Sequence, residues 1–328
     1  MPWRKLVLTL RGLTWAHTRG YVPLVATAQA YSDQHPNTEI VWERRSLWEF
    51  GERPIDQLVD AYDLLVIDYP FVGIAADRAA LLPLDEHVDP SVVQQLATQS
   101  VGPSYSSYAY GGHQWALPLD AASQVAAYRP DLLAQLGAEV PETWQDVLDL
   151  ADATNRVAIP LTKIDALSSF FTLCANLGAE PLSSSEHPVV DPEVGGLALS
   201  RLFALASQVD PACFEMNPIA LLNRMSRTDD IVYAPLVFGY SNYSRDGFAP
   251  RRIAFRGIPV AGGRGMRGAT LGGAGLAISA RTPRRVEALD YAAWVTGAEC
   301  QRTLYTLSGG QPANRVAWQD ELANRVTH

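Results

Sequence analysis

Residues 114–150, QWALPLDAASQVAAYRPDLLAQLGAEVPETWQDVLDL, decide the fold of this chain. Apolar residues alternate with smaller or polar ones over 115–119, and a second strand-like run ends at Tyr128. The next three residues, Arg-Pro-Asp at 129–131, open a helix, since proline is tolerated in the first helical turn. This part of the segment is therefore predicted to be strand followed by helix.

A second helix follows after a short turn. The first helix stops at Gly137, and the turn at 141–144 has the sequence Pro-Glu-Thr-Trp. Thr143 is placed to cap a helix that carries apolar residues over 147–150, and Pro141 fixes the approach of the chain.

The N-terminal part alternates between strands and helices. Strands are predicted at Leu6–Leu10, Glu39–Glu43 and Asp63–Ile67, with helices between them around Pro23–Gln34 and Pro54–Ala61. This order predicts a mostly parallel sheet covered by helices. Ligands of such sheets bind at the carboxyl ends of the strands, so the segments that follow strands are the candidate sites.

Five features in order carry a resemblance to a known family: Pro118, Tyr128, the Arg-Pro-Asp helix start, Gly137 and Pro141-x-Thr143-Trp144. Their succession resembles the hinge-to-second-lobe segment of extracellular solute-binding protein family 1, the sugar-type receptors of ABC importers. Further along, the Gly-rich run 272–280, a helix at 284–296 and the segment 308–312 resemble the family's late strand, its following helix and a loop that closes over the ligand.

The resemblance implies an α/β fold of the periplasmic-binding-protein type, with two lobes, each a mostly parallel sheet flanked by helices, and a ligand cleft between them. Because the family's chain crosses between lobes more than once, we expect lobe one to comprise residues 1–117 and 256–305. Lobe two is then expected at residues 118–255 and 306–328. The length of 328 residues suits two such lobes.

Composition excludes several classes of protein. The formal net charge of −9 and the isoelectric point near 5.2 argue against a nucleic-acid-binding surface, which is normally basic. The three cysteines are far apart, and the six histidines show no paired spacing, so we expect neither a disulfide framework nor a metal site. We expect no cofactor and no membrane-spanning helix, since the most apolar stretch, 64–76, is too short to span.

The N-terminus bears on location and partners. Receptors of the family begin with a signal peptide, whereas Leu6–Leu10 is too short for the apolar region of one and lacks a small-residue cleavage site. As written, the sequence predicts a cytoplasmic protein, or a periplasmic one if the gene start is truncated. The resemblance implies a monomer that binds a small molecule and partners an ABC permease.

The first candidate binding segment is 12–21, which follows the first strand. It brings together an indole, an imidazole, a guanidinium and a phenol, from Trp15, His17, Arg19 and Tyr21. At the mouth of the predicted cleft, these groups can bind hydroxyls or carboxylates. The alternative is that Trp15 packs between loop and helix while Arg19 ties down a helix end.

Two further candidate segments follow the second and third strands. Asp68 and Tyr69 come after the third strand, where a carboxylate can accept a pair of sugar hydroxyls. The alternative is that Asp68 caps the following helix. Arg44 and Ser46 form a candidate of the same kind after the second strand.

The hinge and the second lobe supply the remaining candidates. Asp120 and Gln124 follow the hinge strand, and Tyr240 and Tyr243 lie in a loop-rich segment where aromatic rings suit the C–H faces of sugars. The alternative is that these tyrosines are core residues, although the residues around them predict a surface loop with at least one tyrosine facing the cleft.

The family's Gly-rich strand and late loop add two more candidates, Gly273 and Gln311. A literal G-x-G-x-x-G at 263–268 does not open a helix, as a dinucleotide site would require.

Two functions remain open. The first is a solute-binding protein that closes on a sugar, polyol or sugar acid for ABC-type import. The second is a cytoplasmic enzyme or ligand sensor on the same fold, with His17 and either Asp68 or Asp120 as acid–base groups. No GxSxG, paired metal ligands or Cys–His arrangement supports catalysis, so the receptor is favoured and no catalytic residue is named.

Overall fold

The computed structural model describes residues 7–52, 55–182, 189–262, 265–325 and 327, and the chain divides into two compact units. Unit 1 is Met1–Ala121 with Gly273–Val326, and unit 2 is Ala122–Gly272 with Thr327–His328. Two strands, β6 (Leu117–Tyr128) and β9 (Leu271–Ile278), each begin in one unit and end in the other. The two main changes of unit therefore both occur inside a strand.

Unit 1 is built on strands in the order β2-β1-β3-β9-β6. The first three strands of the chain are β1 (Leu8–Trp15), β2 (Thr38–Arg45) and β3 (Leu64–Ile67). As predicted, β1 runs parallel to both β2 and β3, whereas β9 runs antiparallel to β3. The carboxyl ends of the three parallel strands thus meet at one edge of the sheet.

Both faces of this sheet are covered. Alternate residues of β3 enter two different core clusters, with Leu64 and Val66 in one and Leu65 and Ile67 in the other. A strand buried on both faces reads as a continuous apolar run rather than an alternating one, as β3 does.

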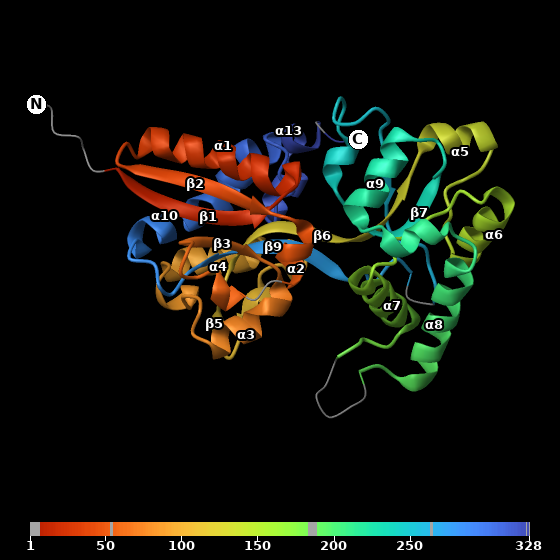
Figure 1. The fold of residues 1–328 in the computed structure, drawn as a ribbon, viewed down its shortest axis with the longest axis horizontal. Coiled ribbons are helices and arrows are strands. Elements are labelled where there is room, and N and C mark those ends of the chain that lie inside the picture. Colours follow the sequence, from red (N-terminus) through yellow and green to blue (C-terminus); the bar gives the residue numbers. More distant parts are fainter. Residues whose placement is uncertain (1–6, 53–54, 183–188, 263–264, 326, 328) are drawn as a thin grey trace, which may run out of the picture. The chain divides into compact units, whose positions relative to one another are not determined.

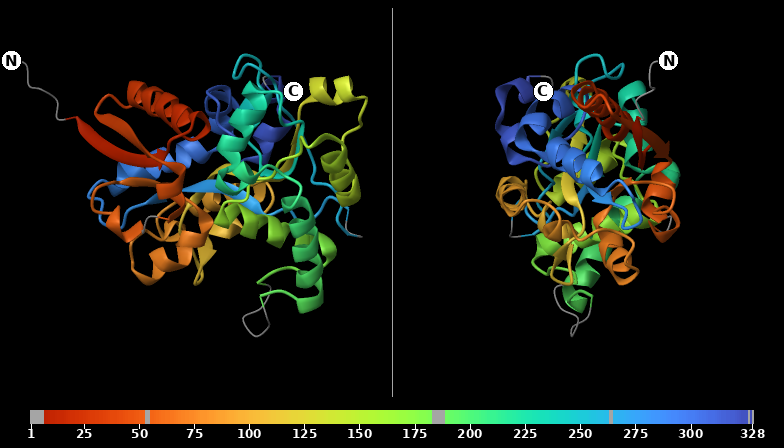
Figure 2. Two further views of the ribbon diagram at one scale, coloured as in Figure 1. Left: turned by 45° about the vertical axis from the view of Figure 1, so that its right-hand side comes forward. Right: turned by 90° about the vertical axis from the view of Figure 1, so that its left-hand side faces the viewer.

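The helices of unit 1 lie between and after these strands, and α1 packs along β1 and β2 (Figure 1; Figure 2). Their bounds are α1 (Thr18–Gln34), α2 (Leu47–Glu52), α3 (Val72–Asp77), α4 (Pro90–Gln99), α10 (Arg285–Thr296), α11 (Ala298–Cys300), α12 (Arg315–Gln319) and α13 (Glu321–Asn324). A π-helical turn, η7 (Gln301–Tyr305), follows α11, and the short strands β4 (Ala109–Tyr110) and β5 (His113–Gln114) pair with each other. The unit also contains the 3-10 turns η1 (Ile55–Gln57), η2 (Tyr69–Phe71), η3 (Leu84–Glu86) and η4 (Ser106–Tyr108).

The predicted end of the first strand at Leu10 is wrong. β1 continues to Trp15 and α1 begins at Thr18, so only two residues connect them. Glycine is needed at position 12 of the strand because the Trp42 ring lies 2.5 Å from where a Cβ would stand. The helix expected around Pro54–Ala61 is also wrong over its described residues, which form only the three-residue turn η1.

Unit 2 contains the second part of β6 with two further strands, β7 (Tyr233–Phe238) and β8 (Ala254–Arg256). Both pair with β6 in antiparallel fashion, so the mostly parallel sheet expected for each lobe is found in unit 1 but not among these strands. In the described part of unit 2, parallel pairing is limited to isolated bridges, such as that of Val157 with Tyr233.

The helices of unit 2 surround this sheet and form one large apolar core with it. Their bounds are α5 (Pro130–Leu136), α6 (Trp144–Thr154), α7 (Lys163–Leu177), α8 (Pro192–Ala206) and α9 (Pro218–Arg227). The predicted stops and starts are confirmed. Gly137 ends α5 in the left-handed conformation at φ 62°, and Thr143 caps α6 in a reciprocal capping box with Asp146.

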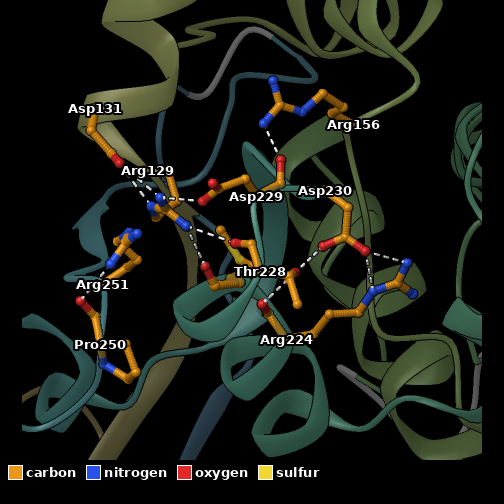
Figure 3. Close-up of polar contacts among 10 residues, drawn as sticks. Arg129, Asp131, Arg156, Arg224, Thr228, Asp229, Asp230, Pro250 and Arg251 are labelled. Carbon is orange, nitrogen blue, oxygen red and sulfur yellow. Dashed lines mark hydrogen bonds and ion pairs between the residues drawn. The ribbon is translucent and has the colours of Figure 1, made fainter.

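The Arg-Pro-Asp helix start has a further role, which Figure 3 shows. Arg129 is fully buried, and its guanidinium donates to both carboxylate oxygens of Asp131, at 2.8 and 2.7 Å. It also donates to Asp229 at 2.8 Å and to the carbonyl oxygens of Met225 and Thr228, each at 2.8 Å. All five N–H groups of one side chain thereby tie the start of α5 to the end of α9.

One amide organises the Gly-rich segment that follows β8. Asn176, buried on α7, accepts hydrogen bonds from the backbone N–H groups of Ala261 (2.7 Å) and Gly262 (3.0 Å). Its NH₂ group donates to the carbonyl oxygens of Gly265 (2.6 Å) and Arg267 (2.7 Å). The first two residues of the G-x-G-x-x-G pattern, 263 and 264, lie outside the described residues. The described remainder is held as a fixed loop on α7.

The unit boundaries differ from the predicted lobe boundaries in three places. Residues 118–121, predicted in lobe two, lie in unit 1. Residues 256–272 lie in unit 2, where β8 pairs with β6 and Asn176 holds the following loop. Residues 306–326 lie in unit 1 rather than with the second lobe. The physical reason is that Gln311 binds β6 within unit 1, donating from its side chain to the carbonyl oxygen of Ala121 at 2.7 Å.

Candidate functional site

The residues after β1, β2 and β3 gather at the carboxyl edge of the unit 1 sheet. Trp15 and Arg45 are register partners at the ends of β1 and β2, and Asp68 directly follows β3. The sequence therefore correctly placed its first-lobe candidates at one edge, because parallel strands end on the same side. The environment of each side chain then decides what it can do.

Trp15 belongs to the core of unit 1. Its side chain is 3% exposed and its ring lies 5.4 Å from the Phe50 ring. The ring also presses on the first turn of α1, where a Cβ on Gly20 would stand 2.3 Å from it. These contacts match the packing interpretation of Trp15 that the sequence left open.

His17 caps α1. Its Nδ1 accepts a hydrogen bond from the backbone N–H of Arg19 at 3.0 Å. Burial, aided by the positive charge of Arg19, lowers the pKa of His17 to about 3. The imidazole is therefore neutral near pH 7, with one ring nitrogen already engaged as an acceptor.

Arg19 and Asp120 form a buried ion pair. Their side chains are 3% and 0% exposed, Nε donates to Oδ2 at 2.8 Å, and a second N–H donates to Oδ1. The two parallel bonds use both carboxylate oxygens, which is the arrangement of an ionised pair. Burial nevertheless raises the pKa of Asp120 more than Arg19 lowers it. Arg19 and Asp120, both predicted to contact the ligand, therefore bind each other.

Asp68 forms no ion pair with a lysine, arginine or histidine among the residues that the structure describes. It is partly buried and caps the turn η2, with Oδ1 accepting from the backbone N–H of Tyr69 at 3.0 Å. The capping role considered from the sequence is therefore real. Burial, together with the nearby charge of Asp120, raises the pKa of Asp68 to about 6.

Tyr108 adds a phenol that sequence reasoning missed. It is buried, and its pKa is raised well above the usual value by burial and by the charges of Asp68 and Asp120. Gly275 of β9 makes room for it, since a Cβ there would stand 2.8 Å from the Tyr108 ring. A sequence signal for this pairing existed only in the glycines of β9, which did not indicate their partner.

Three other candidates, Tyr21, Arg44 and Ser46, follow β1 and β2. Arg44 places its guanidinium 5.2 Å from the centre of the Tyr21 ring, and Ser46 caps α2 by accepting from the backbone N–H of Glu49 at 3.2 Å. The buried arginine of β2 is Arg45, not Arg44, and it lies over the ring of Phe50.

Gly273 and Gln311 support β6 from two sides. Gly273 has a φ of 105°, and a Cβ there would stand 2.3 Å from the carbonyl oxygen of Asp120. Gln311 both donates to and accepts from the backbone of Ala121. Their main evident role is to hold the strand that carries Asp120.

The candidates of unit 2 are buried inside it. Gln124 accepts from the Thr172 hydroxyl at 2.5 Å and donates to the Ser169 hydroxyl at 3.0 Å. Tyr240 and Tyr243 are 6% and 1% exposed and belong to the core cluster. The surface loop expected around these tyrosines is wrong, because the 3-10 turn that carries Tyr243 packs into the core.

The described part of the chain lacks two kinds of feature. No group of three or more His, Cys, Asp or Glu residues is placed to hold a metal ion. Among the described helices, none is long and apolar enough to cross a membrane.

Comparison with protein families bears on the resemblance noted above. Residues 16–157 match the model of the bacterial extracellular solute-binding proteins. The resemblance to this family is confirmed. The matched range contains the strand–helix–helix segment from which the solute-binding fold was inferred.

Solved structures of solute-binding proteins extend the likeness to nearly the whole chain. An ABC transporter solute-binding protein from Agrobacterium radiobacter, in complex with ribitol, matches with a TM-score of 0.82 at 16% identity, covering 99% of this chain and 85% of that one. Maltose-bound MalE3 of Thermotoga maritima matches with a TM-score of 0.79 at 16% identity, covering 98% and 85%. A mannitol-bound solute-binding protein from Agrobacterium vitis gives 0.77 at 17% identity, covering 98% and 81%. The periplasmic-binding-protein-like fold is thereby confirmed.

One curated relative lies outside the solute-binding proteins. The phenylalanine–tRNA ligase beta subunit of Methanocorpusculum labreanum is 26% identical over 184 residues, which are 55% of this chain. The aligned part spans only 33% of that subunit, so the alignment shows neither a shared family nor a shared activity.

Proposed function

We propose that this protein is a solute-binding protein that holds a small hydroxylated molecule, a sugar or polyol, for ABC-type import. The observation that carries the proposal is the fold match, which extends over 98–99% of the chain to solute-binding proteins solved with ribitol, maltose or mannitol. Those ligands belong to those proteins, and they define the class to test here. The family description as extracellular supports action outside the cytoplasm, with an ABC permease as partner.

The carboxyl edge of the unit 1 sheet is where we propose that the ligand binds. Asp68, a partly buried residue at the end of β3, supplies a carboxylate, and charged acceptors form the stronger hydrogen bonds with hydroxyls. Tyr69 is adjacent, and Arg44 with Tyr21 lies at the ends of neighbouring elements. Trp15, Arg19, Asp120 and the buried candidates of unit 2 act by holding the fold in place.

The enzyme alternative needs His17 as an acid–base group, and the geometry does not support that role. A general acid–base must exchange protons near the working pH, whereas the pKa of His17 is lowered to about 3. Its Nδ1 is committed to capping α1. A ligand recovered from the protein should therefore be chemically unchanged.

A binding panel tests the proposal. Titration calorimetry with ribitol, mannitol, maltose and related sugars should give at least one dissociation constant in the micromolar range or tighter. Asp68→Asn should weaken that binding by roughly tenfold to a hundredfold, the cost of one charged hydrogen bond. Asp77→Asn, which removes an exposed carboxylate of α3, is the matched control and should leave the affinity unchanged. Equal affinity in all three proteins would contradict the proposed site.

A further inference from the structure

We propose that helix α8 of unit 2 docks through its exposed apolar face on the same face of a second copy of this chain, with the two helices antiparallel about a two-fold axis. This inference concerns a surface helix of unit 2, so it goes beyond the proposed function and does not depend on it. It departs from the monomer that the family resemblance implies.

Five exposed residues at helical spacing make up the α8 face: Gly196, Leu199, Ser200, Phe203 and Ser207. Residues three, four and seven apart lie on one side of a helix, so these five form one strip. Phe203 is 74% exposed, Leu199 is 56% exposed, and Leu197 beside the strip is 45% exposed. An exposed aromatic ring with exposed apolar neighbours is typical of a surface that binds another protein.

The other side of α8 packs inside unit 2. Its buried residues, Ala198, Leu202 and Leu205, belong to the apolar core of the unit. Figure 1 shows α8 at the rim of this unit, beside α6 and α7, with which it packs. The α8 face is therefore turned away from the core of its own unit.

The α8 face is complementary to a copy of itself, because it carries both a projection and a recess. Phe203 projects, whereas Gly196, two turns earlier, has no side chain, and a Cβ there would meet nothing within 4 Å. An antiparallel pair with its two-fold axis between positions 199 and 200 sets Phe203 of each copy over Gly196 of the other. Leu199 then meets Leu199 beside the axis. A two-fold interface requires self-complementarity of this kind.

The polar groups of the face are satisfied inside the helix. The Ser200 hydroxyl donates to the carbonyl oxygen of Gly196 at 2.9 Å, and the Ser207 hydroxyl donates to that of Phe203 at 2.7 Å. Burying a hydroxyl that already has a hydrogen bond costs far less than burying one without a partner. A second copy can therefore cover both serines without leaving their donors unpaired.

The charges of α8 favour the antiparallel arrangement over a parallel one. Asp191 and Glu193 lie at its beginning, whereas residues 204–209 at its end carry no charge. Parallel helices would bring the acidic beginnings together, and antiparallel helices set each acidic beginning beside an uncharged end. The one charged residue between 194 and 209 is Arg201, which is partly buried and lies on the side of Ala198 and Leu205, away from the face.

Analytical ultracentrifugation of the full chain tests the inference, because it reports self-association directly. Between low micromolar and several hundred micromolar protein, we expect a monomer–dimer equilibrium. One helix from each copy gives an interface at the small end of specific interfaces, so the dissociation constant should lie at about 10–500 μM.

Two substitutions on the face should weaken the dimer by roughly tenfold or more, as expected for a central aromatic contact. Phe203→Glu replaces the projecting ring by a charge. Gly196→Leu fills the recess with a better helix former, so the monomer keeps its fold while the Phe203 ring of the other copy is excluded. Val286→Glu, at a 76% exposed apolar residue of α10 in unit 1, is the matched control for Phe203→Glu and should leave the equilibrium unchanged. Melting curves establish that the variants are folded.

Two cysteine variants test the register. Ser200 and Ser207 are exposed serines of the same face with the same kind of hydrogen bond. At 1.5 Å per residue, the two copies of position 200 differ by about 1.5 Å along the helices, and the two copies of position 207 by about 22 Å. Oxidation with copper phenanthroline should therefore join Ser200→Cys into a disulfide-linked dimer on a non-reducing gel and leave Ser207→Cys as single chains. The native cysteines, Cys174, Cys213 and Cys300, are buried, which keeps the background low.

Two sedimentation results would overturn the inference: a chain that stays monomeric over the whole concentration range, and a dimer that Phe203→Glu and Gly196→Leu both leave unchanged. Equal cross-linking of the two cysteine variants would overturn the antiparallel pairing. These measurements need no ligand, so their failure leaves the proposed function standing, and the binding panel tests that function separately.

Discussion

Replacing Arg129 with methionine tests the account of how unit 2 is held together. Methionine preserves the length and apolar packing of the stem but removes all five N–H donors. Arg129 is 0% exposed, so water cannot take the place of the guanidinium. The network in Figure 3 would lose its centre.

The expected loss of stability follows from the hydrogen bonds that the partners of Arg129 lose. The carbonyl oxygens of Met225 and Thr228 each lose a donor from a charged group, worth about 1.5–3 kcal/mol per bond. Asp131 and Asp229 are 45% and 63% exposed, so they stay hydrated and each adds less than about 1 kcal/mol. These two bonds sum to about 3–6 kcal/mol. Because Thr228 is exposed and water can replace part of its lost bond, we expect Arg129→Met to lower the free energy of unfolding by about 3–5 kcal/mol.

Calorimetry measures the effect as a lower midpoint for the transition that includes unit 2. For a unit of this size, the expected drop is roughly 6–20 °C. Arg251→Met is the matched control, because this exposed arginine of the same region makes one side-chain bond, to the carbonyl oxygen of Pro250 at 3.3 Å (Figure 3). The control should change stability by less than about 0.5 kcal/mol. A loss below about 1 kcal/mol in Arg129→Met would refute the reasoning.

The pH dependence gives an independent check. Hydrogen bonds from Arg129 are the largest cause of the lowered pKa of Asp131. A lowered carboxyl pKa stabilises the fold above the usual pKa of about 3.9, and this contribution is lost as the pH falls through the lowered value. The difference between wild type and Arg129→Met should therefore narrow below about pH 4.

Three further predictions concern other parts of the chain. Because the folded-state pKa of Asp68 is about 6, ionisation disfavours the fold, so wild type should lose stability, at most about 3 kcal/mol, as the pH rises from about 4 to 6. Melting curves should show that Asp68→Asn removes this loss, and parallel curves for both proteins would contradict it. Asn176→Ala should lower the free energy of unfolding by about 2–4 kcal/mol. It should also speed hydrogen exchange at the two backbone N–H groups that donate to the Asn176 side chain. Unchanged protection of these two groups would contradict the anchoring role. Gly273→Ala should destabilise by more than about 2 kcal/mol in urea, since its Cβ would stand 2.3 Å from a carbonyl oxygen at positive φ, whereas Gly196→Ala in α8 meets nothing within 4 Å and should stabilise by up to about 1 kcal/mol. Equal effects of these two glycine substitutions would show that the close approach at Gly273 is not a constraint.

Local signals in the sequence were sufficient for the elements that depend on local chemistry. Gly137 ends α5 because only glycine readily takes its left-handed conformation, and Thr143 caps α6 because its hydroxyl reaches the N–H three residues on. The continuous apolar run of β3 likewise predicted a strand. These rules act within a few residues, so the chain alone reveals them.

The sequence placed the first-lobe candidates at the right edge of the sheet but did not reveal their partners. Asp120 pairs with Arg19 across 101 residues of chain, whereas Asp68 forms no ion pair among the described residues. The sequence did not predict Tyr108 at this edge, because the space for its ring depends on Gly275 of the distant strand β9. Sequence spacing carries no information about such long-range neighbours.

The sequence by itself determined the family resemblance, the order of strands and helices in the first unit, and the edge at which polar side chains gather. Only the tertiary structure decided which of those side chains form ion pairs, caps or core contacts within the fold. The physical reason is that the type of a residue sets what it can bind, whereas burial and pairing set whether that capacity is already satisfied. Those two quantities exist only once distant segments have packed together.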